Sequence, residues 1–266
     1  MKSVTHHGRE TAYETFDRGG TGPGLLCVHG SGGTREVWKP QARLADETPV
    51  TALDLSGHGD SDDTSADAGT ETLSVYADDV AAVAAATDAR VLVGNSLGGA
   101  VALWVALERD VPLDGLVLAG TGPRLPVLDD LLSWLAEDFD RAVDFLHAPD
   151  RLFHATDAEY MTASAAAMHA TGRVVTERDF QTSHAFDVRD RLGEIEVPAL
   201  ALVGEHDRLT PVSYHETLSA EIRRCELGVI EDAAHLAMLE RPQAFCGALS
   251  AFLDRLQRTG DINRPQ

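Results

Sequence analysis

The segment Gly94-Asn95-Ser96-Leu97-Gly98 constrains the fold more than any other part of this sequence. The apolar run Arg90–Val93 precedes it and predicts a short strand, whereas Ala100–Leu107 follows it and is rich in helix-forming residues. A chain that passes from strand to helix within so few residues must turn sharply, and small residues are needed where the two backbones crowd together. Such a turn lifts the Ser96 hydroxyl above the end of the strand.

The rest of the chain alternates strand-like apolar runs with helical patterns. An opening hairpin is expected around residues 7 and 8, and helices are expected near 35–45, 73–86 and 243–256. Further strands are predicted at 25–29, 50–55, 116–119, 198–203 and 226–230. This alternation is typical of a parallel sheet with helices on both faces. The sequence therefore predicts an α/β fold, doubly wound around a mostly parallel sheet of eight strands.

A segment of about 70 residues without a clear strand separates the predicted strands at 116–119 and 198–203, which is long for a connection. Helical patterns occur in it near 128–138, 141–146, 157–169 and 176–184. A helical insertion of this length suggests a cap over the edge of the sheet, and extra packing helices are the alternative. We expect a core made of residues 1–122 and 193–266, with a helical cap of residues 123–192 inserted between strands 6 and 7.

Two later segments offer the partners that a serine nucleophile needs, because a serine hydroxyl reacts well only with a base within hydrogen-bond reach. His235 follows the last predicted strand, so it should return to the same end of the sheet as Ser96. Asp207 follows the strand at 198–203 and can orient that histidine, with Glu205 as the alternative carboxylate. We therefore expect Ser96 as nucleophile, His235 as general base and Asp207 as its partner.

A glycine-rich turn, His29-Gly30-Ser31-Gly32-Gly33, follows another predicted strand. Glycines let the backbone approach a reacting carbonyl closely, so we expect the N–H groups of Ser31 and Leu97 to form an oxyanion hole. A phosphate-binding loop is the alternative, but neither a lysine nor the GxGxxG spacing follows.

Large apolar side chains near the expected cap are candidates for a substrate pocket. We expect Trp38 and Trp134 to bind substrate, and Met161 and Met168 are further candidates. Ordinary packing is the alternative for each of them.

Five motifs together resemble the α/β-hydrolase superfamily over nearly the whole chain. They are HGSGG (29–33), DLSGHGDSD (54–62), GNSLGG (94–99), GEHDRLTP (204–211) and AAHLAMLERP (233–242). In that family the second motif is a structural turn, so the resemblance gives His58 no role as a base. A serine at position 96 argues against the dehalogenase and epoxide hydrolase branches, whose nucleophile is an aspartate.

The resemblance implies a serine hydrolase that cleaves a small or medium carboxylic ester through an acyl-enzyme. Asn95 resembles the residue before the nucleophile in enol-lactonases and carbon–carbon bond hydrolases, which stay open as alternatives. A thioesterase, an acyltransferase and a non-catalytic ligand-binding homologue are further alternatives. We expect no cofactor and no metal, a small-molecule substrate as partner, and a monomer or homodimer.

The chain is strongly acidic, with a formal net charge of −21 from 43 acidic and 22 basic residues. Such a surface repels nucleic acids and anionic membranes, so neither is expected as a partner. Only two of the basic residues, Lys2 and Lys39, are lysines. This composition resembles that of proteins from salt-accumulating halophiles, and we hypothesise such an origin, with an acidic mesophilic enzyme as the alternative.

The sequence also bears on the compartment. No apolar run approaches the roughly 20 residues of a membrane span, and the first residues lack the apolar core of a secretory signal. Three cysteines, Cys27, Cys225 and Cys246, show no CxxC spacing, which fits a reducing compartment. We therefore expect a cytoplasmic protein.

The acidic surface predicts that salt stabilises the fold, because the Debye length shortens from about 10 Å at 0.1 M to about 3 Å at 1 M salt. A gain of about 2 kcal/mol would raise Tm by roughly 4–8 °C for a chain of this size. Thermal melts from about 0.1 M to about 3 M KCl measure the effect, and an osmotically matched sucrose series controls for general exclusion effects. A Tm that is flat in KCl would remove the halophile hypothesis.

Overall fold

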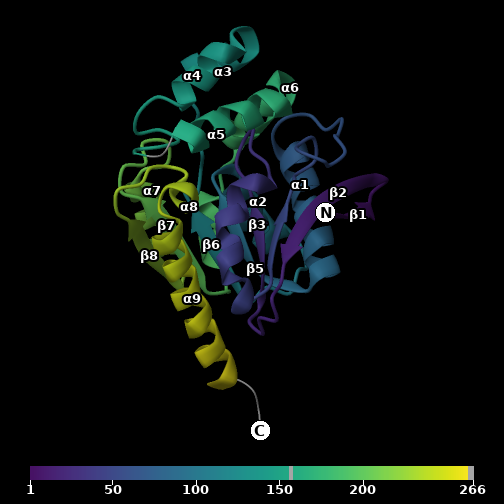
Figure 1. Ribbon diagram of the computed structural model, residues 1–266, viewed down its shortest axis with the longest axis vertical. Coiled ribbons are helices and arrows are strands. Elements are labelled where there is room, and N and C mark those ends of the chain that lie inside the picture. The colour runs from purple at the N-terminus through teal and green to yellow at the C-terminus, as the bar shows by residue number, and fades with distance from the viewer. Residues whose placement is uncertain (156–157, 263–266) are drawn as a thin grey trace.

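The computed structural model describes residues 1–155 and 158–262, and an eight-stranded sheet lies at its centre (Figure 1). The strands are β1 (Lys2–His6), β2 (Arg9–Phe16), β3 (Gly24–Val28), β4 (Val50–Leu53), β5 (Ala89–Asn95), β6 (Gly115–Ala119), β7 (Ala199–Gly204) and β8 (Cys225–Ile230). Their order is β1-β2-β4-β3-β5-β6-β7-β8, with β2 antiparallel to β1 and β4 and the other pairs parallel. The predicted α/β fold with a mostly parallel sheet is confirmed.

Helices pack on both faces of this sheet. One face carries α1 (Thr70–Thr87), α2 (Leu97–Glu108) and α7 (Val212–Glu221), and the other carries η1 (Arg35–Asp46), α8 (Ala237–Glu240) and α9 (Pro242–Ile262). The central strand β3 serves both layers, because Leu25 and Cys27 pack on the η1 side while Leu26 and Val28 pack on the α1 side. In the part of the chain that is described, no helix is both long and apolar enough to cross a lipid bilayer.

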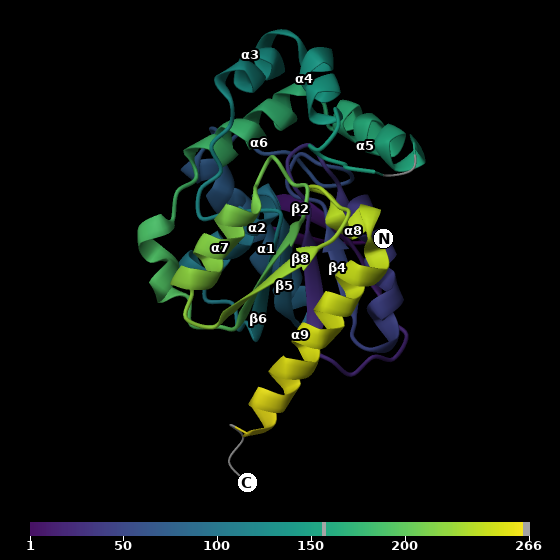
Figure 2. The same ribbon diagram turned by 90° about the vertical axis from the view of Figure 1, so that its left-hand side faces the viewer.

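Four helices follow β6 and precede β7. They are α3 (Asp129–Glu137), α4 (Phe139–Leu146), α5 (Ala158–Thr171) and α6 (Arg173–Ala185), and the short η2 (Arg189–Glu194) leads from them to β7. Figures 1 and 2 show α3–α6 gathered beyond one end of the sheet, away from the far end of α9. Asp157, where the third of these helices was expected to begin, lies outside the described residues.

Several elements differ from the sequence expectations, and the short η2 and α8 were not expected at all. The expected helix near 35–45 is a 3-10 helix that contains Pro40, which cannot donate an α-helical hydrogen bond. Helix α7 was not predicted, because its sequence, VSYHETLSAE, buries only His215 and Leu218 and so carries a weak apolar pattern.

The turn at Ser96 has the strained geometry that the sequence predicted. Ser96 has φ +56° and ψ −119°, a backbone conformation that residues other than glycine rarely adopt. A Cβ on Gly94 would lie 2.2 Å from Gly98 O, and a Cβ on Gly98 would lie 2.3 Å from Val28 O. Both glycines are therefore required by neighbouring backbone, which cannot move aside as a side chain can.

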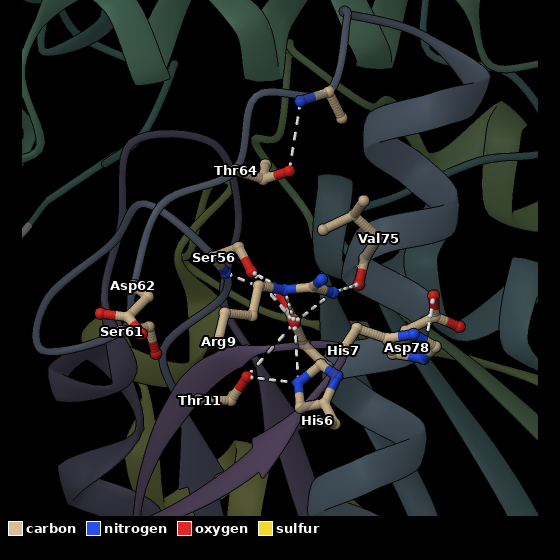
Figure 3. A network of polar contacts seen from close by, with 12 residues as sticks. His6, His7, Arg9, Thr11, Ser56, Ser61, Asp62, Thr64, Val75 and Asp78 are labelled. Carbon is tan, nitrogen blue, oxygen red and sulfur yellow. Dashed lines mark hydrogen bonds and ion pairs between the residues drawn. The ribbon is translucent and has the colours of Figure 1, made fainter.

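A polar network joins the N-terminal hairpin to α1 and to the turn that begins at Asp54 (Figure 3). Asp79 of α1 is fully buried, and its carboxylate accepts hydrogen bonds from Ser56 N at 2.8 Å and from Arg9 Nη2 at 3.2 Å. Arg9 also donates to Ser56 Oγ at 3.0 Å. This network fixes the 54–62 turn against α1 and the N-terminal hairpin.

Gly98→Ala should destabilise the fold by about 1–3 kcal/mol or more, because the added methyl overlaps backbone oxygens of β3 and the turn after it. Urea unfolding measures the change. Gly247→Ala in α9 is the matched control, since nothing lies within 4 Å of its added Cβ. There the same substitution should stabilise by about 0.5–1 kcal/mol through helix propensity. Equal effects of the two substitutions would contradict the packing argument.

Candidate active site

A cavity of ≈ 420 Å³ lies between the carboxyl ends of the strands and helices α3–α6. This volume falls within the range of small-molecule sites, roughly 300–1,000 Å³. Its wall is mostly apolar, with a few polar groups from the strand ends. The residues that line it include Gly30, Ser31, Gly32, Asn95, Ser96, Leu131, Phe145, Met168, Phe180, Arg208, Thr210, Tyr214 and His235.

His235 lies on this wall and meets the carboxylate of Asp207. His235 Nδ1 lies 2.9 Å from Asp207 Oδ2, and both side chains are nearly fully buried. Asp207 also accepts hydrogen bonds from Leu209 N, Thr210 N and Thr210 Oγ1 at 2.8–2.9 Å. Burial alone would raise the pKa of Asp207, but attraction to His235 and the hydrogen bonds from His235 and Thr210 outweigh burial and lower that pKa. The ionised carboxylate makes Nδ1 the donor, which leaves Nε2 free to accept a proton.

The loop that carries His235 is held from two sides. Asn95 Nδ2 donates to His235 O at 3.2 Å and to Ala119 O at 3.3 Å, so the residue before Ser96 also fixes the backbone of His235. On the other side, His235 N donates to Arg151 O at 3.2 Å. Asn95 therefore uses both amide hydrogens inside the protein.

Glu240 adds a second anchor to this loop. Its carboxylate accepts from Ala234 N at 2.6 Å and from His154 N and Ala155 N at 2.9 Å. One buried carboxylate thus joins the chain beside His235 to the segment between α4 and α5.

Ser96 lines the same cavity as His235. Among the described residues no hydrogen bond joins Ser96 Oγ to the imidazole, and in unliganded enzymes such contacts often tighten only when substrate binds. The backbone of Ser96 is held by Ser96 N, which donates to Ala119 O at 3.0 Å, and by Thr121 Oγ1, which donates to Ser96 O at 2.8 Å.

The two expected oxyanion donors flank Ser96. A Cβ on Gly30 would lie 3.0 Å from the Cβ of Ser96, so the glycine-rich turn rests directly against the serine. Leu97 is the first residue of α2, where backbone N–H groups have no partner within the helix. Neither Ser31 N nor Leu97 N donates a hydrogen bond within residues 1–155 and 158–262. Both N–H groups are therefore available to a ligand.

The structure places the expected substrate-binding tryptophans elsewhere. Trp38 is 0% exposed and packs against Phe245 of α9, with ring centroids 6.1 Å apart, so it belongs to the core. Trp134 packs against Phe145 at 5.1 Å, and the Arg141 guanidinium lies 4.2 Å over its ring. Neither tryptophan lines the cavity, because helical spacing alone does not distinguish a core face from a cavity wall.

The two methionines differ from each other. Met168 belongs to the buried core cluster and also lines the cavity, whereas Met161 is partly buried against that cluster and is not on the cavity wall. Sequence reasoning also missed Phe180 and Tyr214, which do line the wall. Tyr214 stands on the unpredicted α7, and Phe180 had no signal beyond its place in the helical segment.

Glu205, the alternative carboxylate, faces away from His235. Its Oε2 accepts from Asp232 N at 3.3 Å and lies 3.8 Å from His206 Nε2. Glu205, His206 and Asp232 each offer a ligand atom within 4.8 Å of the others, and they form the one such group among the described residues. The group lies outside the cavity wall, and exposed acidic clusters of this kind are common without an ion.

His215 supports the backbone of Ser96 through Thr121. Its Nε2 accepts from Thr121 N at 3.1 Å, and its Nδ1 faces Pro211 O at 3.4 Å, so Nδ1 carries the proton and the ring is neutral. Burial lowers the pKa of His215 to about 4. Protonation of Nε2 would set its N–H against that of Thr121, the residue whose hydroxyl donates to Ser96 O.

The sheet order, the strained turn after β5 and the cavity at the carboxyl ends of the strands define the class of α/β hydrolases. Comparison with known proteins agrees with this class. The chain belongs to the Alpha/beta hydrolase family, whose sequence profile matches residues 25–248. The prediction that the protein is a hydrolase is thereby confirmed.

Several named relatives extend over most of the chain. It is 30% identical to a pimeloyl-[acyl-carrier protein] methyl ester esterase of Cronobacter sakazakii, over 87% of this chain and 93% of the relative. The structure of a thermophilic esterase matches with a TM-score of 0.84 and 31% identity, over 96% of this chain and 97% of that one. An enol-lactonase from Burkholderia xenovorans LB400 matches with a TM-score of 0.81, over 95% of this chain and 100% of that one. Its 22% identity makes this a likeness of fold alone.

The buried neutral His215 predicts a loss of stability in acid. Its ordinary pKa near 6.5 applies in the unfolded chain, whereas the folded value is about 4. Between these two pH values only the unfolded chain binds the proton, so the free energy of unfolding falls as pH falls, by roughly 2 kcal/mol for this group at pH 5.

Urea unfolding at pH 7.5 and pH 5 measures this loss. His215→Gln can still accept from Thr121 N but does not titrate, so it should lose less stability on acidification than the wild type. His169→Gln is the control, because the His169 side chain is 47% exposed. If His215→Gln and His169→Gln both kept the pH dependence of the wild type, the neutral state of His215 would be refuted.

Proposed function

We propose that this protein hydrolyses a small or medium carboxylic ester through Ser96, His235 and Asp207. The observation that carries the proposal is the buried 2.9 Å contact between Asp207 and His235, together with the position of His235 on the wall of the cavity that Ser96 also lines. Named relatives that are esterases support an ester as the bond that is cleaved.

The reaction follows from the proton positions. His235 Nε2 accepts the Ser96 proton while Oγ attacks the ester carbonyl, and the imidazolium that forms is stabilised by Asp207. The carbonyl oxygen takes up negative charge between the N–H groups of Ser31 and Leu97. His235 then donates its proton to the leaving alcohol, and water releases the acyl-enzyme by the same steps.

The mostly apolar wall supports an acyl group with little charge. We assign helices α3–α6 as a cap, with residues 123–192 as the inserted unit and residues 1–122 and 193–266 as the core. Leu131, Phe145, Met168 and Phe180 come from this segment and line the cavity, which supports a role for it in substrate selection.

A lactone or carbon–carbon substrate remains the alternative on the same residues. Asn95 was its sequence signal, but both amide hydrogens of Asn95 bond to backbone oxygens, so that residue does not favour it. The small-molecule partner, the cytoplasmic location, the monomer or homodimer and the halophile origin also stay hypotheses. The relatives named above give the halophile origin no support.

A fluorophosphonate probe tests the nucleophile. The wild type should be labelled at Ser96 and should hydrolyse p-nitrophenyl esters, and Ser96→Ala should lose labelling and about 10⁴–10⁶-fold in kcat. A panel of acyl chain lengths and simple lactones then separates an esterase from a lactonase. Equal labelling of both proteins would mean that another residue reacts.

The two carboxylates serve as a matched pair in the same assay. Asp207→Asn should lower kcat by about 10⁴-fold, because the amide turns the imidazole toward the wrong tautomer. Glu205→Gln should leave kcat nearly unchanged, since Glu205 contacts Asp232 and His206 and not His235. The reverse result would transfer the role to Glu205.

A further inference from the structure

Asp179 of α6 is a fully buried carboxylate that joins three distant parts of the chain. Its Oδ2 accepts from Gly32 N at 2.9 Å and lies 2.8 Å from His58 Nε2. Its Oδ1 accepts from Tyr76 OH at 2.6 Å. A charge so deeply buried is costly unless every lone pair is used, and here it ties the helical segment to the glycine-rich turn.

Gly32 is held by this segment at both of its peptide groups. Asp179 accepts from its N–H, and Thr171 Oγ1 donates to its carbonyl oxygen at 3.3 Å. Gly32 has φ +65°, and a Cβ there would lie 3.0 Å from Met168 Cγ and 3.2 Å from Thr176 Cγ2. Helices α5 and α6 therefore pack directly onto the residue that follows Ser31.

His58 supplies the positive partner. Its Nε2 faces the Asp179 carboxylate, and its Nδ1 lies 3.2 Å from Ser56 O, so both ring nitrogens face acceptors and both carry protons. Burial alone would lower the pKa of His58, but the charge of Asp179 and its hydrogen bond outweigh burial and raise that pKa. Arg178 opposes the rise, and Tyr76 and the His29 ring complete the surroundings.

His29 holds the other side of Ser31. Its Nε2 accepts from Leu55 N at 3.1 Å, so Nδ1 carries the proton and donates to Gly30 O at 2.9 Å. The residues on both sides of Ser31 are thus fixed by buried groups, with His29 acting on Gly30 and Asp179 acting on Gly32.

We propose that Asp179 is a positioning residue that aims the Ser31 N–H at the reacting carbonyl oxygen by fixing Gly32. This inference rests on the proposed function, because it assigns Ser31 to the oxyanion hole. A glycine-rich turn has many conformations, and an oxyanion donor helps only if its direction is set before the charge develops. The helical segment therefore contributes to the chemistry as well as to the pocket wall.

The test is Asp179→Ala in the full chain, assayed with a p-nitrophenyl ester. Removing one oxyanion donor outright lowers kcat by about 10²–10³-fold, so loosening one donor should lower it by about 10–100-fold. KM should change by less than about threefold, since Asp179 itself is not on the cavity wall. Asp179→Asn keeps an oxygen for Gly32 N and should recover most of kcat.

Inhibition by ketones separates a loosened donor from general damage. Ser96 Oγ adds to the carbonyl carbon of a trifluoromethyl ketone, the Ser96 proton moves to His235, and the carbonyl oxygen becomes an oxyanion. The matched methyl ketone binds mainly without forming that bond. Asp179→Ala should lower the affinity for the trifluoromethyl ketone by about 10-fold or more and leave the affinity for the methyl ketone nearly unchanged.

Asp79→Ala is the matched control. Asp79 is also fully buried and also accepts a backbone N–H, that of Ser56, but unlike Asp179 it binds no residue of the glycine-rich turn. It should lower Tm in the same way as Asp179→Ala while kcat and the ratio of the two ketone affinities stay within about twofold of the wild type.

A second variant keeps the test decisive if Asp179→Ala does not fold. Replacing a buried ion pair by apolar side chains of similar size is often neutral for stability, so His58→Leu/Asp179→Leu should fold while Gly32 N loses its acceptor. A kcat and a ketone ratio within twofold of the wild type in either folded variant would overturn the positioning role. A wild type that neither reacts with fluorophosphonate nor hydrolyses any ester would instead refute the proposed function.

Discussion

The strained backbone at Ser96 is the constraint on which the rest of the structure depends. Its positive φ is held because β3, β5 and β6 end together, with Gly94 and Gly98 allowing the backbones to touch. A single residue with such a conformation costs on the order of 1–3 kcal/mol, so surrounding contacts must overdetermine it. Thr121 supplies one of them through Ser96 O, and His215 in turn fixes Thr121.

Buried histidines do much of this work, and each has a protonation state that its neighbours dictate. His29 and His215 each receive a backbone N–H on Nε2, which keeps them neutral. His58 faces a carbonyl and a carboxylate, which makes it a cation. His235 has a carboxylate on Nδ1 alone, so its second nitrogen is left toward the cavity. Position within the hydrogen-bond network, and not the residue type, separates the candidate base from the three structural rings.

The helical segment between β6 and β7 is joined to the site by polar contacts as well as by apolar packing. Asp179 binds the turn at Gly32, and the chain at Arg151 accepts from His235 N. The first contact reaches the backbone next to Ser31, and the second reaches the backbone of His235 itself. Movement of this segment would therefore displace the glycine-rich turn at Gly32 and the backbone of His235, in addition to any change in access to the cavity.

The sequence by itself determined the α/β class with a mostly parallel sheet, the turn at Ser96 and the strand ends that carry Asp207 and His235. These features depend on the local spacing of apolar residues and glycines. The tertiary structure decided which carboxylate meets the imidazole, Asp207 or Glu205, since both follow the same strand. It also decided that Trp38 is core and that Asp179 reaches Gly32. Trp38 and Asp179 depend on contacts with residues more than a hundred positions away, which are set by how helices pack across the sheet, and no local pattern encodes that packing. The choice of carboxylate depends on the conformation of the loop after β7.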